Sequence, residues 1–331
     1  MKKIKNRYGL LLLTVIPIWC GSCNEDWVTE QYEHYISFKA PLDDNGVSRI
    51  SVRYKSDGYV TYQLPLIVSG STTIDKDITV HVAVDSDTLQ ILNALRFQNR
   101  TDFYYRELDS QYFKMPETVE IKAGESTALM GIDFSLAGID LTDKWVLPLT
   151  ITDDPSYDYQ SHPRKHYKRA LIYVTPFNDY SGIYGGTALK TWFKGDEDGA
   201  ALVKSEIPVH VVNDTTVFFY AGTVDETRAD RRNYKIYLTF DIETGAVTLS
   251  SDNPDMHFTT TATPLFVIKE AMDATRPYLL HRYVTVSGIE YEYTDYTLVP
   301  GENIVYVVKG VITMERKINT QIPDEDQAIE W

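Results

Sequence analysis

Two glutamates on one predicted strand have the spacing that acid–base catalysis would need. Glu290 and Glu292 lie two positions apart, so they share a strand face with their side chains roughly 7 Å apart. Glycoside hydrolysis uses two carboxylates about 5 to 10 Å apart. Because neighbouring charges on one strand usually form a solvated face, we expect a non-catalytic protein and keep a glycoside hydrolase as an alternative.

Aromatic residues beside polar ones indicate a different chemistry, the binding of sugars. Pyranose C–H faces pack on flat aromatic rings, while the hydroxyls need polar partners. Tyr291, Tyr293 and Asp295 share one face of a predicted strand by period two. Trp192 ends another predicted strand, beside two lysines. These four are candidate glycan-binding residues, and a half-buried barrel wall is the alternative interpretation.

A second aromatic pair lies on a polar loop rich in turn-forming residues. Tyr157 and Tyr159 alternate with polar residues in this loop. Loop tips are exposed and often carry binding residues. The pair joins the candidate glycan-binding residues, with a plain surface loop as the alternative.

The sequence predicts no metal site and no cofactor. His162 and His166 have the i, i+4 spacing of a helical metal site, but Pro163 breaks that helix and a third ligand is missing. The segment 196–199 resembles part of a calcium loop but lacks the acid at its twelfth position. Nucleophile-elbow, phosphate-binding and dinucleotide-binding glycine patterns are absent from the sequence.

Three arginines share one predicted turn with three acids. They could hold an acidic sugar, but pairing among these charges is the simpler interpretation. The residues are Arg228, Arg231 and Arg232 with Asp225, Glu226 and Asp230.

The amino terminus has the pattern of an export signal. Four basic residues precede an apolar run from Leu10 to Trp19, which is too short to span a bilayer. The chain's two cysteines, Cys20 and Cys23, follow, and two small residues stand immediately before Cys23. We predict a signal peptide at 1–22.

The cysteine region resembles a bacterial lipoprotein signal. The resemblance implies that Cys23 is acylated, and several acyl chains give a lasting membrane anchor. The acidic residues 24–26 resemble signals that send Bacteroidota lipoproteins to the outer face of the outer membrane. We therefore expect an anchor and linker at 23–32 and an exterior location, with an ordinary secretory signal as the alternative.

The chain as a whole is acidic and rich in aromatic residues. Its 331 residues carry 32 Lys and Arg against 47 Asp and Glu, a formal net charge of −15, and 12% of them are aromatic. Nucleic acid needs a basic surface and is excluded as a partner. The aromatic content indicates a folded body.

Short β-branched and aromatic runs between turn signals predict an all-β fold. Eight such runs indicate a β-sandwich over 33–177, interrupted by one helix at 86–97 whose N-cap we expect at Ser86 or Asp87. Ten further runs indicate an antiparallel β-barrel or sandwich over 178–331. The acidic segment 323–330 is expected to be a solvated tail.

Two segments of this all-β chain resemble a known family. Residues 145–151 read Trp-Val-Leu-Pro-Leu-Thr-Ile, and residues 178–184 read Asn-Asp-Tyr-Ser-Gly-Ile-Tyr. Together with Cys23, they resemble two-domain Bacteroidota surface lipoproteins over nearly the whole mature chain. The resemblance implies an immunoglobulin-like N-terminal domain of unknown function and a C-terminal β domain, which a lipocalin-like barrel would fit.

The same resemblance implies a role at the cell surface. Such proteins are commonly encoded beside outer-membrane carbohydrate importers. We therefore expect a glycan-binding or accessory protein in polysaccharide uptake, with a polysaccharide or oligosaccharide and an importer complex as partners. A surface scaffold is the alternative.

Overall fold

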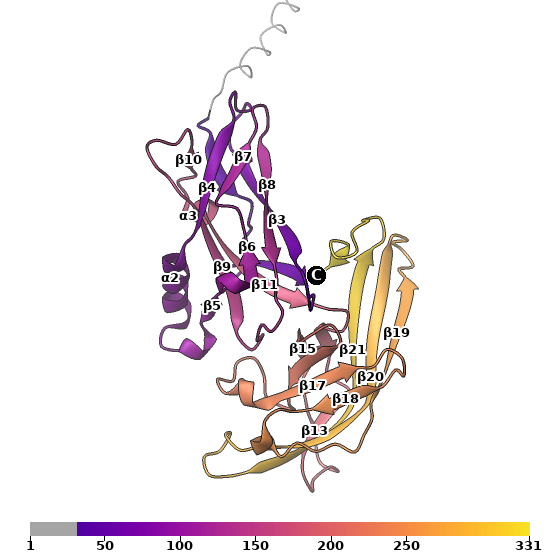
Figure 1. The fold of residues 1–331 in the computed structure, drawn as a ribbon. Coiled ribbons are helices and arrows are strands. Elements are labelled where there is room, and N and C mark those ends of the chain that lie inside the picture. Colours follow the sequence, from indigo (N-terminus) through magenta and orange to yellow (C-terminus); the bar gives the residue numbers. More distant parts are fainter. Residues whose placement is uncertain (1–31) are drawn as a thin grey trace, which may run out of the picture.

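The computed structural model describes residues 32–331, apart from the Lys165 side chain. The predicted signal peptide, the Cys23 anchor and the acidic residues 24–26 lie outside the described residues. In the part that is described, no helix is long and apolar enough to cross a membrane. The expected all-β fold, a sandwich followed by an antiparallel β domain, is confirmed (Figure 1).

The first domain is a sandwich of two sheets, because its strands alternate apolar and polar side chains and bury one face each. One sheet has the order β10-β1-β3-β8-β6, and the other has the order β2-β11-β9-β4-β7 with β5 beside β9. The strands are β1 (Tyr35–Phe38), β2 (Ser48–Arg53), β3 (Val60–Val68), β4 (Ile78–Val84), β5 (Tyr105–Glu107), β6 (Phe113–Lys114), β7 (Thr118–Ile121), β8 (Thr127–Phe134), β9 (Lys144–Ile151), β10 (Gln160–Ser161) and β11 (Arg169–Phe177).

One helix covers the outer face of the second sheet (Figure 1). The predicted helix is confirmed as α2 (Ser86–Phe97), but its N-cap is Asp85, whose side chain accepts a hydrogen bond from the Thr88 backbone. Leu89 of this helix packs on Val146 and Leu171 of the sheet. The remaining helical segments are short: α3 (Lys165–Lys168) and the 3₁₀ turns η2 (Thr101–Phe103), η3 (Ser110–Tyr112), η4 (Arg231–Tyr234) and η5 (Pro254–Met256).

The second domain is one 11-stranded sheet that curls around its own core. Its edges meet where Ala246 bridges to Leu265, so the sheet closes like a barrel at that point. The strands are β12 (Gly182–Gly185), β13 (Leu189–Phe193), β14 (Leu202–Val203), β15 (Glu206–Val211), β16 (Thr216–Tyr220), β17 (Lys235–Phe240), β18 (Val247–Ser250), β19 (Leu265–Met272), β20 (Leu279–Asp295), β21 (Ile304–Asn319) and β22 (Ile329–Glu330).

Strands β20 and β21 form one long hairpin (Figure 1). Two of the ten runs expected in the second domain, 283–286 and 289–298, overlap β20. A bulge at Gly288 joins them into one strand and reverses the side-chain alternation. On β21, Gly310 has a φ of 149°, and a Cβ there would collide with the Ala188 carbonyl. Glycine is therefore required where β13 begins to pair with β21.

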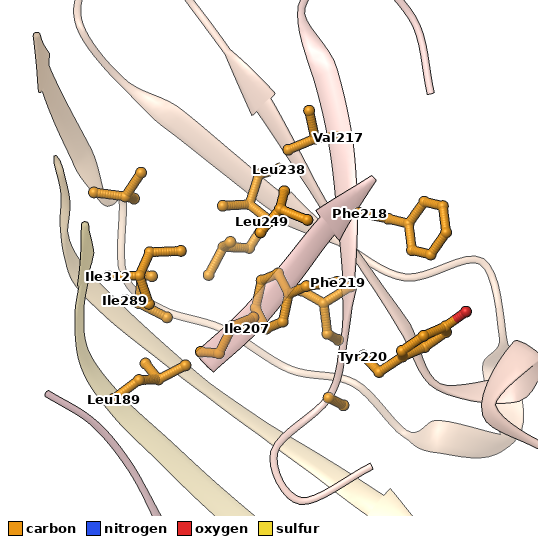
Figure 2. Packing of buried hydrophobic residues seen from close by; sticks show 14 of the residues in the cluster. Leu189, Ile207, Val217, Phe218, Phe219, Tyr220, Leu238, Leu249, Ile289 and Ile312 are labelled. Carbon is orange, nitrogen blue, oxygen red and sulfur yellow. The ribbon is translucent and has the colours of Figure 1, made fainter. Parts of the chain in front are cut away.

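Strand β16 is buried on both faces. Val217 and Phe219 point into the core, whereas Phe218 and Tyr220 point the opposite way (Figure 2). The outward ring of Phe218 lies against Lys235, with the ammonium 4.8 Å from the ring centre. Lys235 also binds Asp140 of the first domain at 2.8 Å, and Leu141 of that domain packs against the buried core of the second domain. The first domain therefore lies beside the outward face of β16.

The acidic carboxy-terminal segment is exposed at Asp324, Glu325 and Glu330, as expected, but it is held to the fold and is not a free tail. Its β22 pairs with β21, and Asp326 forms an ion pair with Arg53 of the first domain at 2.5 Å. Trp331 packs edge-on against Phe177 at 4.7 Å between ring centres. Strand pairing and contact with the first domain explain why the segment is ordered despite its charge.

Candidate functional site

A cavity of about 420 Å³ lies at the junction of the two domains. Its volume is in the range of small-ligand sites, which often occupy domain interfaces. Residues of β2, β9 and β11 form the side given by the first domain. Residues of β12, β15, β21 and β22, with the segment after β16, form the other side.

The floor of the cavity is the outward face of the second sheet of the sandwich. Arg49 on β2 is in register with Tyr173 on β11, so their side chains share a face. Lys144 at the start of β9 also lines the cavity. Arg49 donates from Nε to Thr175 Oγ1 at 3.1 Å, and its guanidinium lies 5.9 Å from the centre of the Tyr173 ring. The floor therefore combines cations, hydroxyls and the aromatic rings of Tyr173 and Phe177.

The opposite wall carries a histidine–glutamate pair. His210 on β15 lies with its Nε2 2.7 Å from Glu226 Oε1, and because the carboxylate can only accept, Nε2 donates. Arg231 Nε lies 4.0 Å from the other oxygen of the same carboxylate. Burial alone would raise the pKa of Glu226, but the bond from His210 and the charges of Lys144 and Arg231 lower it. Glu226 is thus a paired carboxylate.

Lys144 and Tyr173 have pKa values that are shifted by their burial. Burial lowers the pKa of Lys144. The charge of Glu226 opposes this shift, and those of Arg231, Arg96 and Arg49 add to it. Burial raises the pKa of Tyr173 to about 12, so its hydroxyl stays neutral and can donate a hydrogen bond. The cavity therefore offers polar groups of several kinds within a partly desolvated space.

Two polar contacts between the domains flank the cavity. At one of them, Asp140 accepts from Lys235 at 2.8 Å and from Arg232 at 3.2 Å. Arg231 is 3% exposed and donates to the Thr142 carbonyl at 2.9 Å. These contacts join the loop before β9 to η4 and β17, which brings Glu226 and Lys144 to the same cavity.

The second contact lies at the other side of the junction. Arg53 pairs with Asp179 at 3.1 Å, and its guanidinium lies 5.0 Å from the centre of the Phe177 ring. Buried Arg316 donates to the carbonyls of Asn178 and Ser181. Backbone acceptors, ion pairs and ring contacts together fix this edge of the cavity.

The predicted platform of Tyr291, Tyr293 and Asp295 lies inside the second domain. All three share one face, as expected, but each is at most 1% exposed because that face points into the core. The tyrosine hydroxyls accept from the Gly222 and Thr223 backbone amides. The expectation of a sugar platform here is wrong, since no ring face is open to a ligand.

Asp295 is instead the centre of a buried charge network. Arg228 binds both of its oxygens, at 2.5 and 2.8 Å, and Tyr234 donates to it at 2.9 Å. Burial would raise the pKa of Asp295, but these hydrogen bonds lower it to about 2. The predicted charge pairing in the arginine turn is confirmed for Arg228 with Asp230 and for Arg231 with Glu226, whereas Arg232 pairs with acids of the first domain.

Trp192 lies on the outer face of the second domain, away from the cavity. It is partly buried, and its indole N–H donates to the Gly199 carbonyl at 3.3 Å. The neighbouring Glu290 and Glu292 pair with Lys309 and Lys194 at 2.8 and 2.7 Å. The two glutamates thus form an ion-paired, solvated face. Trp192 lies beside these charged side chains and does not line the cavity between the domains.

Tyr157 and Tyr159 lie together at the end of the sandwich. The Tyr157 ring stacks on His81, with ring centres 4.0 Å apart. Tyr159 is 7% exposed, and its hydroxyl accepts from the His81 amide and donates to the Thr152 carbonyl. Tyr157 is partly exposed, so the expected exposure holds in part for this residue. It is wrong for Tyr159, whose hydrogen bonds hold the loop to the strands.

The two histidines with metal-like spacing have structural neighbours. His162 packs against Tyr35 and Tyr167, and His166 lies beside Tyr167. Across residues 32–331, no group of three or more His, Cys, Asp or Glu side chains could hold a metal ion.

Sequence reasoning did not find the cavity residues Lys144, Tyr173 and His210. Each places a polar group on a strand face that points away from the core of its own domain, and this polar position is the signal the sequence contains. What covers an outward face depends on how the domains dock, and alternation along a strand does not encode docking.

The fold and the cavity define a class: a two-domain all-β protein with a ligand-sized space between its domains. Two family models match the chain. The domain of unknown function DUF4973 matches residues 27–155, and a model of a C-terminal domain matches residues 168–313.

Solved structures from Bacteroides match nearly the whole chain. A Bacteroides ovatus protein of unknown function is 45% identical with a TM-score of 0.82, covering 90% of this chain and 100% of that one. An auxiliary nutrient binding protein from Bacteroides thetaiotaomicron is 45% identical with a TM-score of 0.80, covering 91% and 100%. A Bacteroides ovatus multidomain protein including DUF1735 is 43% identical with a TM-score of 0.81, covering 90% and 100%.

The chain belongs to this family of two-domain Bacteroides proteins. Among curated proteins, none matches it.

Proposed function

We propose that the protein is a non-catalytic, lipid-anchored nutrient-binding protein of the cell surface that binds a glycan as an accessory to outer-membrane uptake. One observation carries the proposal: a relative that is 45% identical, and is covered over 100% of its length, is described as an auxiliary nutrient binding protein. The anchor is Cys23, and the importer complex is the expected partner.

The cavity between the domains is the ligand site that this proposal favours. It combines the Tyr173 ring with convergent polar side chains, and sugars need both flat apolar area and hydrogen-bonding groups. Glu226 with His210 offers acceptor and donor atoms on the facing wall. A ligand held there would contact both domains.

A cavity-filling substitution tests this assignment. Ser51 lines the cavity, and Ser51→Trp would occupy the space without removing a polar group of the far wall. We expect full-length Ser51→Trp protein, purified in detergent, to lose glycan retention in affinity electrophoresis over a broad polysaccharide panel. Ser126→Trp on the exposed surface of the first domain is the matched control and should bind normally.

The outer-face tryptophan provides the competing assignment. Trp192→Ala should leave retention unchanged if the cavity is the site. Loss of retention in Trp192→Ala, with binding intact in Ser51→Trp, would move the glycan site to the outer face. If no polysaccharide of the panel retains the wild-type protein, the proposal of glycan binding is overturned.

The lipid anchor has its own test. Cells grown with a clickable palmitate analogue should label the wild-type protein, and Cys23→Ser should abolish the label. Cys20→Ser is the matched control and should keep it, because the small residues that a signal peptidase needs stand before Cys23. Label that persists in Cys23→Ser would contradict the anchor.

A further inference from the structure

The partly buried acids of the cavity already have basic partners in the protein. Asp143 pairs with an arginine at 2.9 Å, and Glu226 accepts from a histidine at 2.7 Å and lies 4.0 Å from Arg231. The other two acids of the lining, Glu315 and Glu330, are exposed. No partly buried carboxylate on these walls is therefore left to neutralise a further cation.

Two cations on the floor lack such partners. Within residues 32–331, neither Lys144 nor Arg49 has a carboxylate within the 4.0 Å of an ion pair. Arg49 is exposed, and its side chain donates one hydrogen bond, to a threonine hydroxyl. Lys144 is partly buried and feels the charge of Glu226, which is beyond ion-pair distance, together with the opposing charges of Arg231 and Arg96. A partly buried ammonium with no carboxylate at ion-pair distance is costly, and a bound anion would lower that cost.

The surroundings of these two cations favour a sugar carboxylate as the anion. The Tyr173 ring lies beside Arg49, which gives a flat apolar surface next to the charge. Arginine and lysine are the side chains that bind carboxylates by charge-assisted hydrogen bonds. The chain carries a net charge of −15, so an anionic ligand would be repelled by most of the surface and needs a locally positive site.

We propose that the cavity binds the carboxylate of an acidic sugar, with Lys144 and Arg49 as the anion-binding residues. The inference rests on the proposed glycan binding and names the class of glycan, one that contains uronic or other carboxylated sugars. The ring of that sugar lies toward Tyr173, and its hydroxyls face the wall that carries His210 and Glu226.

The experiment compares acidic polysaccharides with their carboxyl-reduced forms. Full-length protein in detergent is run in affinity electrophoresis against polygalacturonate, alginate and hyaluronan, against the same polymers after carbodiimide–borohydride reduction, and against neutral glucans and mannans. We expect retention by at least one acidic polymer and its loss after reduction, because reduction removes the charge and keeps the sugar backbone.

Substitution of the anion-binding residues gives the second readout. Lys144→Gln and Arg49→Gln should each weaken binding of the retained polymer by roughly tenfold or more, the effect of losing one charge-assisted hydrogen bond. Lys190→Gln removes the same charge from an exposed site on β13 and should change binding by less than about twofold. Equal melting temperatures of the variants exclude misfolding as the cause.

The outcomes separate the two proposals. Retention by neutral polymers alone, retention that survives carboxyl reduction, or unchanged binding in Lys144→Gln would overturn the acidic-sugar inference while glycan binding stands. Absence of retention by any polymer would overturn both.

Discussion

At the scale of single residues, the strongest electrostatic feature is the carboxylate of Asp295. It is fully buried and satisfied by Arg228, Tyr234 and the Leu298 backbone amide. Removing one partner of a buried charge pair is costly because it leaves the other partner unpaired in a desolvated site. This network holds the end of β20 to the arginine turn, so its contribution to the free energy of unfolding can be measured.

We predict that Asp295→Asn lowers the free energy of unfolding by about 3 kcal/mol, because it replaces a fully buried carboxylate that binds Arg228 through both of its oxygens. Urea denaturation followed by tryptophan fluorescence measures this change. Asp198→Asn is the matched control, because Asp198 is exposed, and it should change stability by less than about 0.5 kcal/mol. Equal losses in both variants would contradict the network.

The same residue predicts a dependence on pH. The folded pKa of Asp295 is lowered to about 2, below the value near 3.9 of an unfolded aspartate. Its stabilising contribution is therefore complete above about pH 4 and is lost as the pH falls towards 2. Denaturation at pH 4.5, 3 and 2 should show a steeper loss of stability in the wild type than in Asp295→Asn. Identical slopes would contradict the pKa shift.

Residue types alone could suggest the charge pairing in the arginine turn but could not place Asp295. Its neighbours Tyr291 and Tyr293 follow the alternation expected of a strand, and alternation cannot tell which face is the core. The glutamates at 290 and 292 were expected on a solvated face, and the structure has them there because the bulge at Gly288 sets the register of the second half of β20.

At the scale of elements, the pairing of β21 with β13 requires a glycine at position 310. Gly310→Ala should lower the free energy of unfolding by at least about 2 kcal/mol, because the new Cβ meets the Ala188 carbonyl and the residue keeps a positive φ. Gly301→Ala is the control, since Gly301 has a φ of +84° and open space around it. It should cost only about 1 kcal/mol. Thermal unfolding that ranks the two variants equally would contradict the contact.

Most strands could be predicted, because short β-branched runs between turns are a local signal. The exceptions depend on partners far along the chain. The run 257–261, one of the ten expected in the second domain, makes only a single bridge, from Thr259 to Glu292. The acidic segment near the carboxy terminus was expected to be a solvated tail, and pairing with β21 explains why its end is held to the sheet.

At the scale of the whole molecule, the domains are held by charged side chains. Asp140 of the first domain and Lys235 of the second form a contact at 2.8 Å that should be measurable in solution. We predict that Asp140→Asn and Lys235→Met are non-additive, with a coupling energy of about 1 kcal/mol in a double-mutant cycle. Asp140→Asn with Lys190→Gln is the control cycle and should be additive within about 0.5 kcal/mol. Additivity in both cycles would contradict the docked arrangement.

The candidate site depends on that arrangement, which explains why its residues could not be predicted. Lys144 and Glu226 are 82 positions apart in the sequence and belong to different domains. Each was visible as a charged residue, but only docking brings them to one cavity. Sequence patterns report which face of a strand is polar and do not report which other domain covers it.

The doubly buried β16 has a consequence for how the protein is made. The sandwich is the amino-terminal domain and is synthesised first. Domains generally fold as units in the order of their synthesis. When Phe218 and Tyr220 emerge, the partner that shields them has therefore already been produced. A circular permutant that places the second domain ahead of the sandwich would leave Phe218 and Tyr220 exposed to solvent for longer. It should form more insoluble aggregate at equal expression.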